Sequence, residues 1–211
     1  MTETEWLTCT DPDPILEFII SRATERKLLL FGCACWRAVW EHVKPASRRF
    51  VEATEQYADE RITWEQLKAV WDMIDGKDSD SLHRWLHSSM REKLTWELTG
   101  FHAASKGFDG TAMTPDDWLN QLKTQSDMLR EVFGNPFRSP HVHSSRLKWN
   151  GNAIRRLAHS IYDRRAFDQM PILADALEEA GCTDAAILNH CRQPGEHVRG
   201  CWVLDLLLGK E

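Results

Sequence analysis

The residues with the clearest potential for chemistry gather near the C-terminal end of the chain. Cys182, His190, Cys191, His197 and Cys201 place several soft or borderline metal ligands within a short stretch of sequence. Zinc takes four such groups, and His197 and Cys201 would share one face, at i and i+4, if the last segment is helical. We therefore predict a zinc site formed by Cys182, Cys191, His197 and Cys201, with His190 as the alternative ligand held in reserve if one of these four does not bind.

A second interpretation of the same residues stays open. Their spacing matches no zinc-finger pattern, and no Cys-x-x-Cys pair is present. Cysteine is also among the most buried residue types and packs as a small apolar side chain. On this interpretation the cysteines lie in a core, and the histidines cap helices or form pairs with other polar groups.

Two further histidine pairs carry weaker signals. His83 and His87 have i, i+4 spacing, but the His-Glu-x-x-His pattern that supplies a base between two zinc ligands is absent, so an exposed helix face is expected. His141 and His143 lie in a loop flanked by prolines and could bind a metal only with further ligands.

A basic segment follows that loop. Its arginines could receive an acidic partner or a phosphate backbone, with Trp149 available for stacking. The alternative is pairing within the chain, with Asp175, Glu178 and Glu179 on a neighbouring helix. The residues proposed for contact with a polyanion are Arg155, Arg156, Arg164 and Arg165.

Composition and missing motifs exclude several classes of protein. The net charge of −6 argues against general adhesion to nucleic acid or to an anionic membrane. The N-terminus lacks the basic and apolar regions of a secretory signal, and no apolar run is long enough to span a bilayer, so we expect a soluble cytoplasmic protein. No nucleophile elbow, phosphate loop or dinucleotide fingerprint appears, and no catalytic residue is assigned.

Helix signals run through most of the chain. Asp13-Pro14 has the form of an N-cap followed by proline, and Thr63 with Gln66 has the form of a capping box. The segment from about Glu25 to Val43 is apolar almost all round and predicts a central helix. Its Cys33 and Cys35 would point in opposite directions, which favours core positions over a shared metal. Further helices are predicted within 82–98, 114–133, 154–162, 172–180 and 183–191.

These elements predict an all-α fold, an irregular array of many helices with one central apolar helix. Ten tryptophans favour an aromatic core. The glycine and prolines of 134–140 cannot continue a helix, so residues 1–133 and 150–211 are expected to form two helical regions joined by a loop over 134–149. The final apolar run from Val198 to Leu208 is interpreted as helix, although a buried strand at 202–204 also fits.

Several phrases of the sequence together resemble an uncharacterised, multi-copy family of bacterial proteins. The resemblance spans both ends and the middle of the chain, apart from roughly residues 42–125. It implies one small protein and carries over no activity, ligand or catalytic residue. The phrases are Glu5–Leu7 with Asp11-Pro12, Arg26–Leu28 with Phe31–Cys35, Arg130–Arg138, Arg165–Phe167, Pro171–Cys182 and His197–Trp202.

The leading functional hypothesis is a non-enzymatic helical interaction or adaptor protein with another protein as its partner. Abundant helix faces and the lack of a catalytic signature motivate it. A zinc-binding protein with a C-terminal Cys/His site is the main alternative. A nucleic-acid-binding protein that uses the local basic helix is the second.

Overall fold

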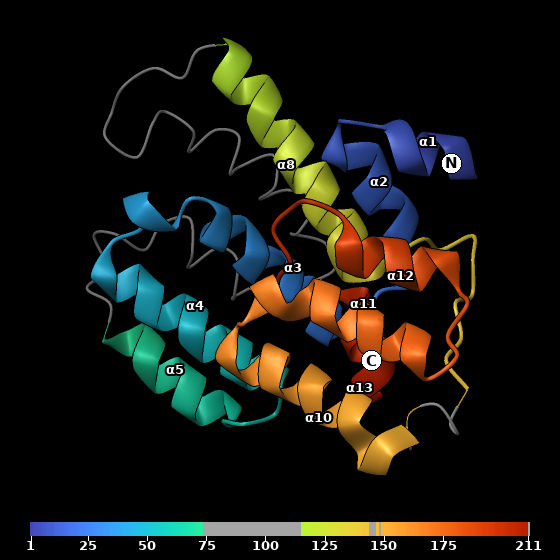
Figure 1. The fold of residues 1–211 in the computed structure, drawn as a ribbon. Coiled ribbons are helices and arrows are strands. Elements are labelled where there is room, and N and C mark those ends of the chain that lie inside the picture. The colour runs from blue at the N-terminus through green and yellow to red at the C-terminus, as the bar shows by residue number, and fades with distance from the viewer. Residues whose placement is uncertain (74–114, 144–146, 148, 211) are drawn as a thin grey trace. The chain divides into compact units, whose positions relative to one another are not determined.

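The chain folds into helices. A computed structural model describes residues 1–73, 115–143, 147 and 149–210, and within these residues every regular element is a helix (Figure 1). The predicted all-α fold is therefore confirmed. The helix expected within 82–98, with His83 and His87, lies outside the described residues. The chain divides into an N-terminal unit, Met1–Leu129, and a C-terminal unit, Arg130–Glu211.

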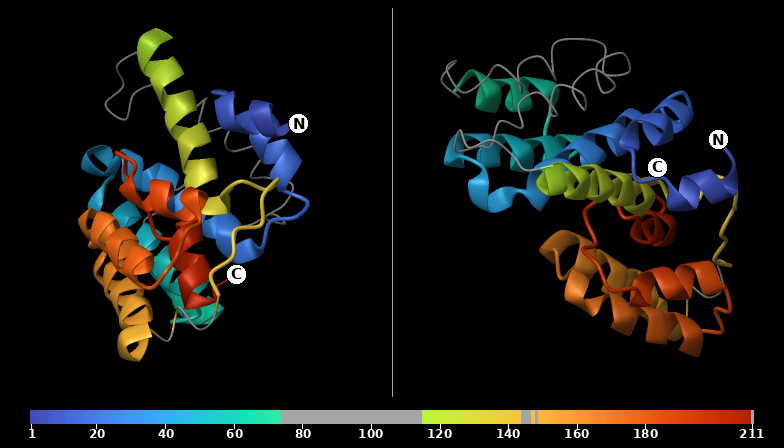
Figure 2. Two further views of the ribbon diagram at one scale, coloured as in Figure 1. Left: turned by 45° about the vertical axis from the view of Figure 1, so that its right-hand side comes forward. Right: turned by 90° about the horizontal axis from the view of Figure 1, so that it is seen from above.

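The N-terminal unit is built around one apolar helix. Helix α3 buries eight consecutive residues, Leu28 to Cys35, and packs against α4, which in turn packs against α5 (Figures 1 and 2). The helix ends at Ala38, earlier than expected, and a short 3₁₀ turn follows. The elements are α1 (Glu3–Thr8), α2 (Pro12–Ile19), α3 (Glu25–Ala38), η1 (Trp40–His42), α4 (Pro45–Ala58), α5 (Trp64–Asp72) and the larger part of α8 (Pro115–Phe133).

Side-chain caps determine where these helices begin. The Thr63 hydroxyl accepts the backbone N–H of Gln66, and the Gln66 side chain accepts that of Thr63, so the predicted capping box is confirmed. The predicted start of α2 at Asp13-Pro14 is wrong by two residues. Asp11 is the cap, accepting the Asp13 N–H at 3.1 Å, and Pro12 takes the first helical position, where a missing N–H costs nothing.

The C-terminal unit encloses a separate apolar core. Its helices are α10 (Trp149–Arg164), η2 (Phe167–Gln169), α11 (Met170–Glu179), α12 (Ala185–Arg192) and α13 (Trp202–Leu208), together with the last turn of α8 from Arg130 (Figure 1). Helix α10 packs against α11 and α13, and α11 packs against α12. The core side chains include Ile161, Leu173 and Leu204, all fully buried.

The final apolar run is helical from Trp202, as interpreted from the sequence, and the alternative of a buried strand at 202–204 is wrong. One detail of this unit was not expected. At the start of α10, Asn150, Gly151 and Asn152 all have left-handed backbone conformations, with φ of 45°, 62° and 65°. Asparagine and glycine tolerate this region best, which explains why regular helix begins only after them. The helix predicted within 183–191 is α12, and Asp184 caps it by accepting the N–H groups of Ala186 and Ile187.

Candidate metal centre

Four buried side chains of the C-terminal unit converge on one point. Glu131 comes from the last turn of α8, His190 from α12, His197 from the loop that follows α12, and Cys201 from the residue directly before α13. One ligand atom from each lies within 4.8 Å of every other. Carboxylate, imidazole and thiolate are all ligands of zinc and related divalent ions. The group could therefore hold a metal ion.

Glu131 is the hub of this group. One carboxylate oxygen, Oε1, lies 2.9 Å from Nδ1 of His197, and the other, Oε2, lies 3.3 Å from Nε2 of His190. The Sγ atom of Cys201 lies 3.2 Å from the same Nε2 atom. The two imidazole rings meet edge to face, with centroids 5.0 Å apart. Each carboxylate oxygen thus serves one histidine.

The environment of Glu131 keeps its carboxyl group ionised. Burial alone raises the pKa, because a charge is poorly solvated in the interior. Hydrogen bonds from His190 and His197, together with the positive charge of both rings when they are protonated in acid, outweigh burial and hold the pKa of Glu131 at about 2. A carboxylate that accepts two N–H groups is stabilised in its charged form. The group therefore carries a buried negative charge.

Hydrogen bonding assigns the tautomers of both histidines. The Trp202 indole N–H can only donate, and it donates to Nδ1 of His190 at 3.1 Å, so neutral His190 carries its hydrogen on Nε2. Nδ1 of His197 donates to the Glu131 carboxylate, which leaves a lone pair on Nε2. This Nε2 atom is buried and has no hydrogen-bond partner in the described structure. Such an orphaned buried atom is costly, and it lies on the far side of the ring from Glu131.

The last turn of α8 is held against α13 at Gly134. Gly134 has a φ of +66° and donates its N–H to the Arg130 carbonyl, which ends the helix in the left-handed form that glycine adopts most readily. A Cβ atom at this position would lie 3.0 Å from Cγ of Trp202. The same indole packs on His190, with ring centroids 5.0 Å apart. Gly134 thus allows the close approach that brings Glu131 to its partners.

The structure brings together only part of the predicted metal set. His197 and Cys201 belong to the group, and so does His190, the reserve ligand. They do not share a helix face, because α13 begins at Trp202, after both of them. Cys182 and Cys191 lie in the apolar core and are not members of the group. Burial, together with the charge of Glu131, raises the pKa of Cys191 to about 12, as for an inert thiol.

Glu131 is the member that the sequence did not indicate. It lies in a helix far along the chain from the other three, and a single glutamate in a helix is ordinarily a solvated residue. The one signal is its position next to the apolar pair Val132-Phe133 at the end of the helix. None of the six cysteines, all of which lie in the described part of the chain, forms a disulfide bond.

The acidic residues expected to pair with the arginines of the basic segment pair with another arginine. Arg155, Arg156 and Arg164 are exposed on α10, whereas Arg165 is half-buried with a φ of 55°. Asp175 and Glu178, the acidic residues expected to face them, both pair with Arg192 of α12. Contact of the four arginines with a polyanion stays a prediction.

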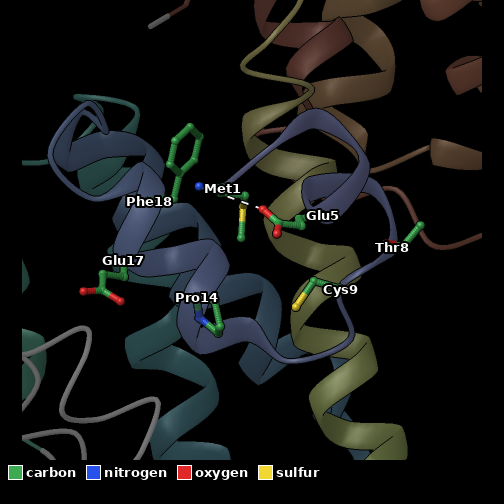
Figure 3. A pocket seen from close by; sticks show the side chains of 7 residues that line it. All are labelled: Met1, Glu5, Thr8, Cys9, Pro14, Glu17 and Phe18. Carbon is green, nitrogen blue, oxygen red and sulfur yellow. Dashed lines mark ion pairs between the residues drawn. The ribbon is translucent and has the colours of Figure 1, made fainter.

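A pocket in the N-terminal unit offers less chemistry. It has a volume of about 660 Å³ and is lined by Met1, Glu5, Thr8, Cys9, Pro14, Glu17 and Phe18 (Figure 3). Glu5 points toward the Met1 amino group, 4.0 Å away, and its carboxylate also accepts the Thr2 N–H that closes the cap of α1. Two of its charged groups, the Met1 amino group and the Glu5 carboxylate, therefore already interact with each other.

Comparison with known proteins gives no relative from which a role could be transferred: no family model, no curated protein and no solved structure matches the chain. The resemblance to a bacterial family stays a prediction. Among the described helices, none is both long and apolar enough to cross a membrane. The inference of function therefore rests on the geometry of the group around Glu131.

We predict that the stability of the metal-free protein falls in acid because of Glu131. Its pKa is about 2 in the folded chain against an ordinary value of 4.5, so its contribution is full above pH 4.5 and is lost as the pH falls toward 2. The loss should reach roughly 3 kcal/mol. Urea unfolding of wild type and Glu131→Gln, with a chelator present, measures it. Equal acid sensitivity in the two proteins would contradict this assignment.

We also predict that Gly134→Ala destabilises the protein more than Gly181→Ala. Both glycines have positive φ, +66° and +83°, but only at Gly134 would the new Cβ meet Trp202; at Gly181 nothing lies within 4 Å. The shared backbone strain costs about 1 kcal/mol, and the clash should add about 1 to 3 kcal/mol at Gly134 alone. Denaturant midpoints of the two variants provide the comparison. Matching losses would show that Trp202 does not pack on Gly134 as described.

Proposed function

We propose that the C-terminal unit is a zinc-binding module in which the ion joins the end of α8, α12 and the start of α13. The observation that carries this proposal is the buried group of Glu131, His190, His197 and Cys201, whose ligand atoms lie within 4.8 Å of one another. The arrangement of His197 is compatible with it: Nδ1 faces Glu131, and the buried Nε2 atom, which has no partner among the described residues, can receive the hydrogen when Nδ1 binds the ion. Two imidazoles, one thiolate and one carboxylate make a typical donor set for zinc.

The spacing of the ligand atoms suits a tetrahedral ion. Zinc binds nitrogen or oxygen at about 2.0–2.1 Å and sulfur at about 2.3 Å, which places neighbouring ligand atoms about 3.4–3.6 Å apart in a tetrahedron. The distances from Nε2 of His190 to Oε2 of Glu131 and to Sγ of Cys201 are 3.3 and 3.2 Å. The four ligand atoms lie up to 4.8 Å apart, so side-chain movements of about 1 Å would bring all of them to one ion.

The nature of the site favours a structural role. All four side chains are buried, and four protein ligands complete a tetrahedral shell, whereas catalytic zinc keeps a position for water. When bound, the ion would supply a cross-link and would compensate the buried charge of Glu131. Burial and the nearby Glu131 charge hold the pKa of Cys201 well above its usual range, so zinc must displace the thiol proton when it binds.

We predict about one zinc ion per chain, bound through Cys201 and not through the neighbouring cysteines. Cys201→Ser should weaken zinc binding by more than about 100-fold, because losing a direct ligand costs more than losing an outer partner. Cys182→Ser and Cys191→Ser are matched controls, buried in the same core but outside the group, and should retain affinity. Elemental mass spectrometry on untagged protein gives the zinc content, and competition with a chromophoric chelator gives the affinity.

The outcomes separate the two metal hypotheses. Zinc loss in Cys182→Ser or Cys191→Ser, with Cys201→Ser still binding, would support the set predicted from sequence and overturn the present proposal. Absence of zinc from the wild type, together with no thermal stabilisation when zinc is added, would overturn both. A ligand that binds only the folded state must raise its stability, so the thermal midpoint provides an independent measurement.

An interaction role for the whole chain is compatible with a structural zinc ion, because a closed site leaves function to the surface. Ile172 on α11 is 58% exposed and Phe137 is 41% exposed, which places large apolar side chains of the C-terminal unit in contact with solvent. Isolated exposed apolar residues are common in proteins, so these two identify no partner. The adaptor hypothesis and the nucleic-acid alternative both stay proposals.

A further inference from the structure

We infer that Trp202 is a positioning residue that lowers the metal affinity of the group. It holds His190 in the tautomer whose Nε2 atom carries the hydrogen and therefore has no lone pair for an ion. This inference rests on the proposed zinc site. Trp202 itself supplies no ligand atom; it acts through His190. The consequence is that the protein contains a built-in restraint on its own metal binding.

The contact between Trp202 and His190 is specific. The indole N–H donates to Nδ1 at 3.1 Å, and the two rings pack with centroids 5.0 Å apart and planes tilted by 55°. Behind the indole, Gly134 leaves no free space, since even a Cβ atom there would lie 3.0 Å from it. The indole is therefore held on both sides with its single donor aimed at His190.

This hydrogen bond opposes metal binding. A neutral imidazole can offer only one lone pair, and the indole takes the one on Nδ1. For Nε2 to bind an ion, the hydrogen must move to Nδ1, where it would face the indole N–H, a donor against a donor. Metal-bound histidine normally donates its second N–H to an acceptor. The present arrangement supplies a donor where an acceptor is needed.

A substitute acceptor lies beside the same atom. The Gln193 side-chain amide, at the C-terminal cap of α12, has its nitrogen 3.3 Å from Nδ1 of His190. Rotation of the amide would place its oxygen there, able to accept the hydrogen of a metal-bound His190. Movement of the indole away from Nδ1 and rotation of Gln193 would then accompany the binding of the ion.

His197 shows the contrast within the same group. Its Nδ1 already donates to Glu131 at 2.9 Å, and its Nε2 lone pair has no partner among the described atoms. Since Nε2 lies on the far side of the ring from Glu131, His197 must bind an ion beside Glu131 through Nδ1. Its hydrogen then moves to Nε2, where no donor opposes it among the described atoms. The restraint is therefore confined to His190 and to the hydrogen-bond donor that faces it.

Removing the indole N–H should strengthen zinc binding. Trp202→Phe keeps an aromatic ring between His190 and Gly134 but deletes the donor, and we expect about 5- to 10-fold tighter binding, the equivalent of one net hydrogen bond. Gln193→Ala removes the substitute acceptor and should weaken binding by a similar factor. Trp149→Phe is the matched control, because Trp149 packs on the core of the same unit but is not a member of the group, and it should leave the affinity unchanged.

The measurement uses the full chain, with zinc affinity from chelator competition and the His190 tautomer from nitrogen-15 NMR. Metal-free wild type should show hydrogen on Nε2 of His190, and zinc-loaded protein hydrogen on Nδ1. Equal or weaker binding by Trp202→Phe, or hydrogen on Nδ1 in the metal-free wild type, would overturn the inference while zinc binding by wild type still stands. If wild type and variant both fail to bind zinc, the proposed function fails instead. The wild-type NMR measurement remains decisive if Trp202→Phe does not fold.

Discussion

The carboxylate of Glu131 accepts N–H groups from two histidines in a buried position, and the surrounding arrangement follows from the need to satisfy that charge. An isolated carboxylate in the interior would be strongly destabilising. Here each oxygen has its own partner, at 2.9 Å on His197 and 3.3 Å on His190. Because these partners come from different segments, the same contacts that stabilise the charge also tie α8, α12 and the loop before α13 together.

The local backbone makes this convergence possible. Asp184 caps α12 and so fixes the start of the helix that carries His190. Gly134 ends α8 in the left-handed region and lets Trp202 approach the turn that carries Glu131. Cys201 lies at the N-terminal cap of α13 without a side-chain cap bond, so its thiol remains directed at His190. Caps and turns that are determined by neighbouring residues thus position side chains whose contacts are with distant parts of the sequence.

The sequence predicted the helices better than the contacts between them. Capping residues such as Thr63 and Asp184 act within one turn, so their pattern is visible in the chain. Two adjacent Asp-Pro pairs compete to start α2, and the pattern alone favoured the wrong one. The left-handed residues in the first turn of α10, and the choice of helix over strand at 202–204, depend on packing that a short apolar run does not encode.

The candidate site was only partly visible for the same reason. His197 and Cys201 were found because residues that can bind metal are concentrated near the C-terminus. Cys182 and Cys191 belong to the same concentration, and the sequence does not show that they are buried core residues. Glu131 was missed because its partners lie on other elements, and only the fold brings them within 4.8 Å. A carboxylate in a helix gives no sign of this in the sequence.

Zinc K-edge X-ray absorption on zinc-loaded, untagged protein tests the central claim most directly, because it counts the sulfur atoms around the ion. Our account predicts one sulfur at about 2.3 Å and three nitrogen or oxygen atoms at about 2.0–2.1 Å, from Cys201, the two histidines and Glu131. Two or three sulfur ligands would mean that Cys182 or Cys191 binds the ion, and would contradict a site built around Glu131.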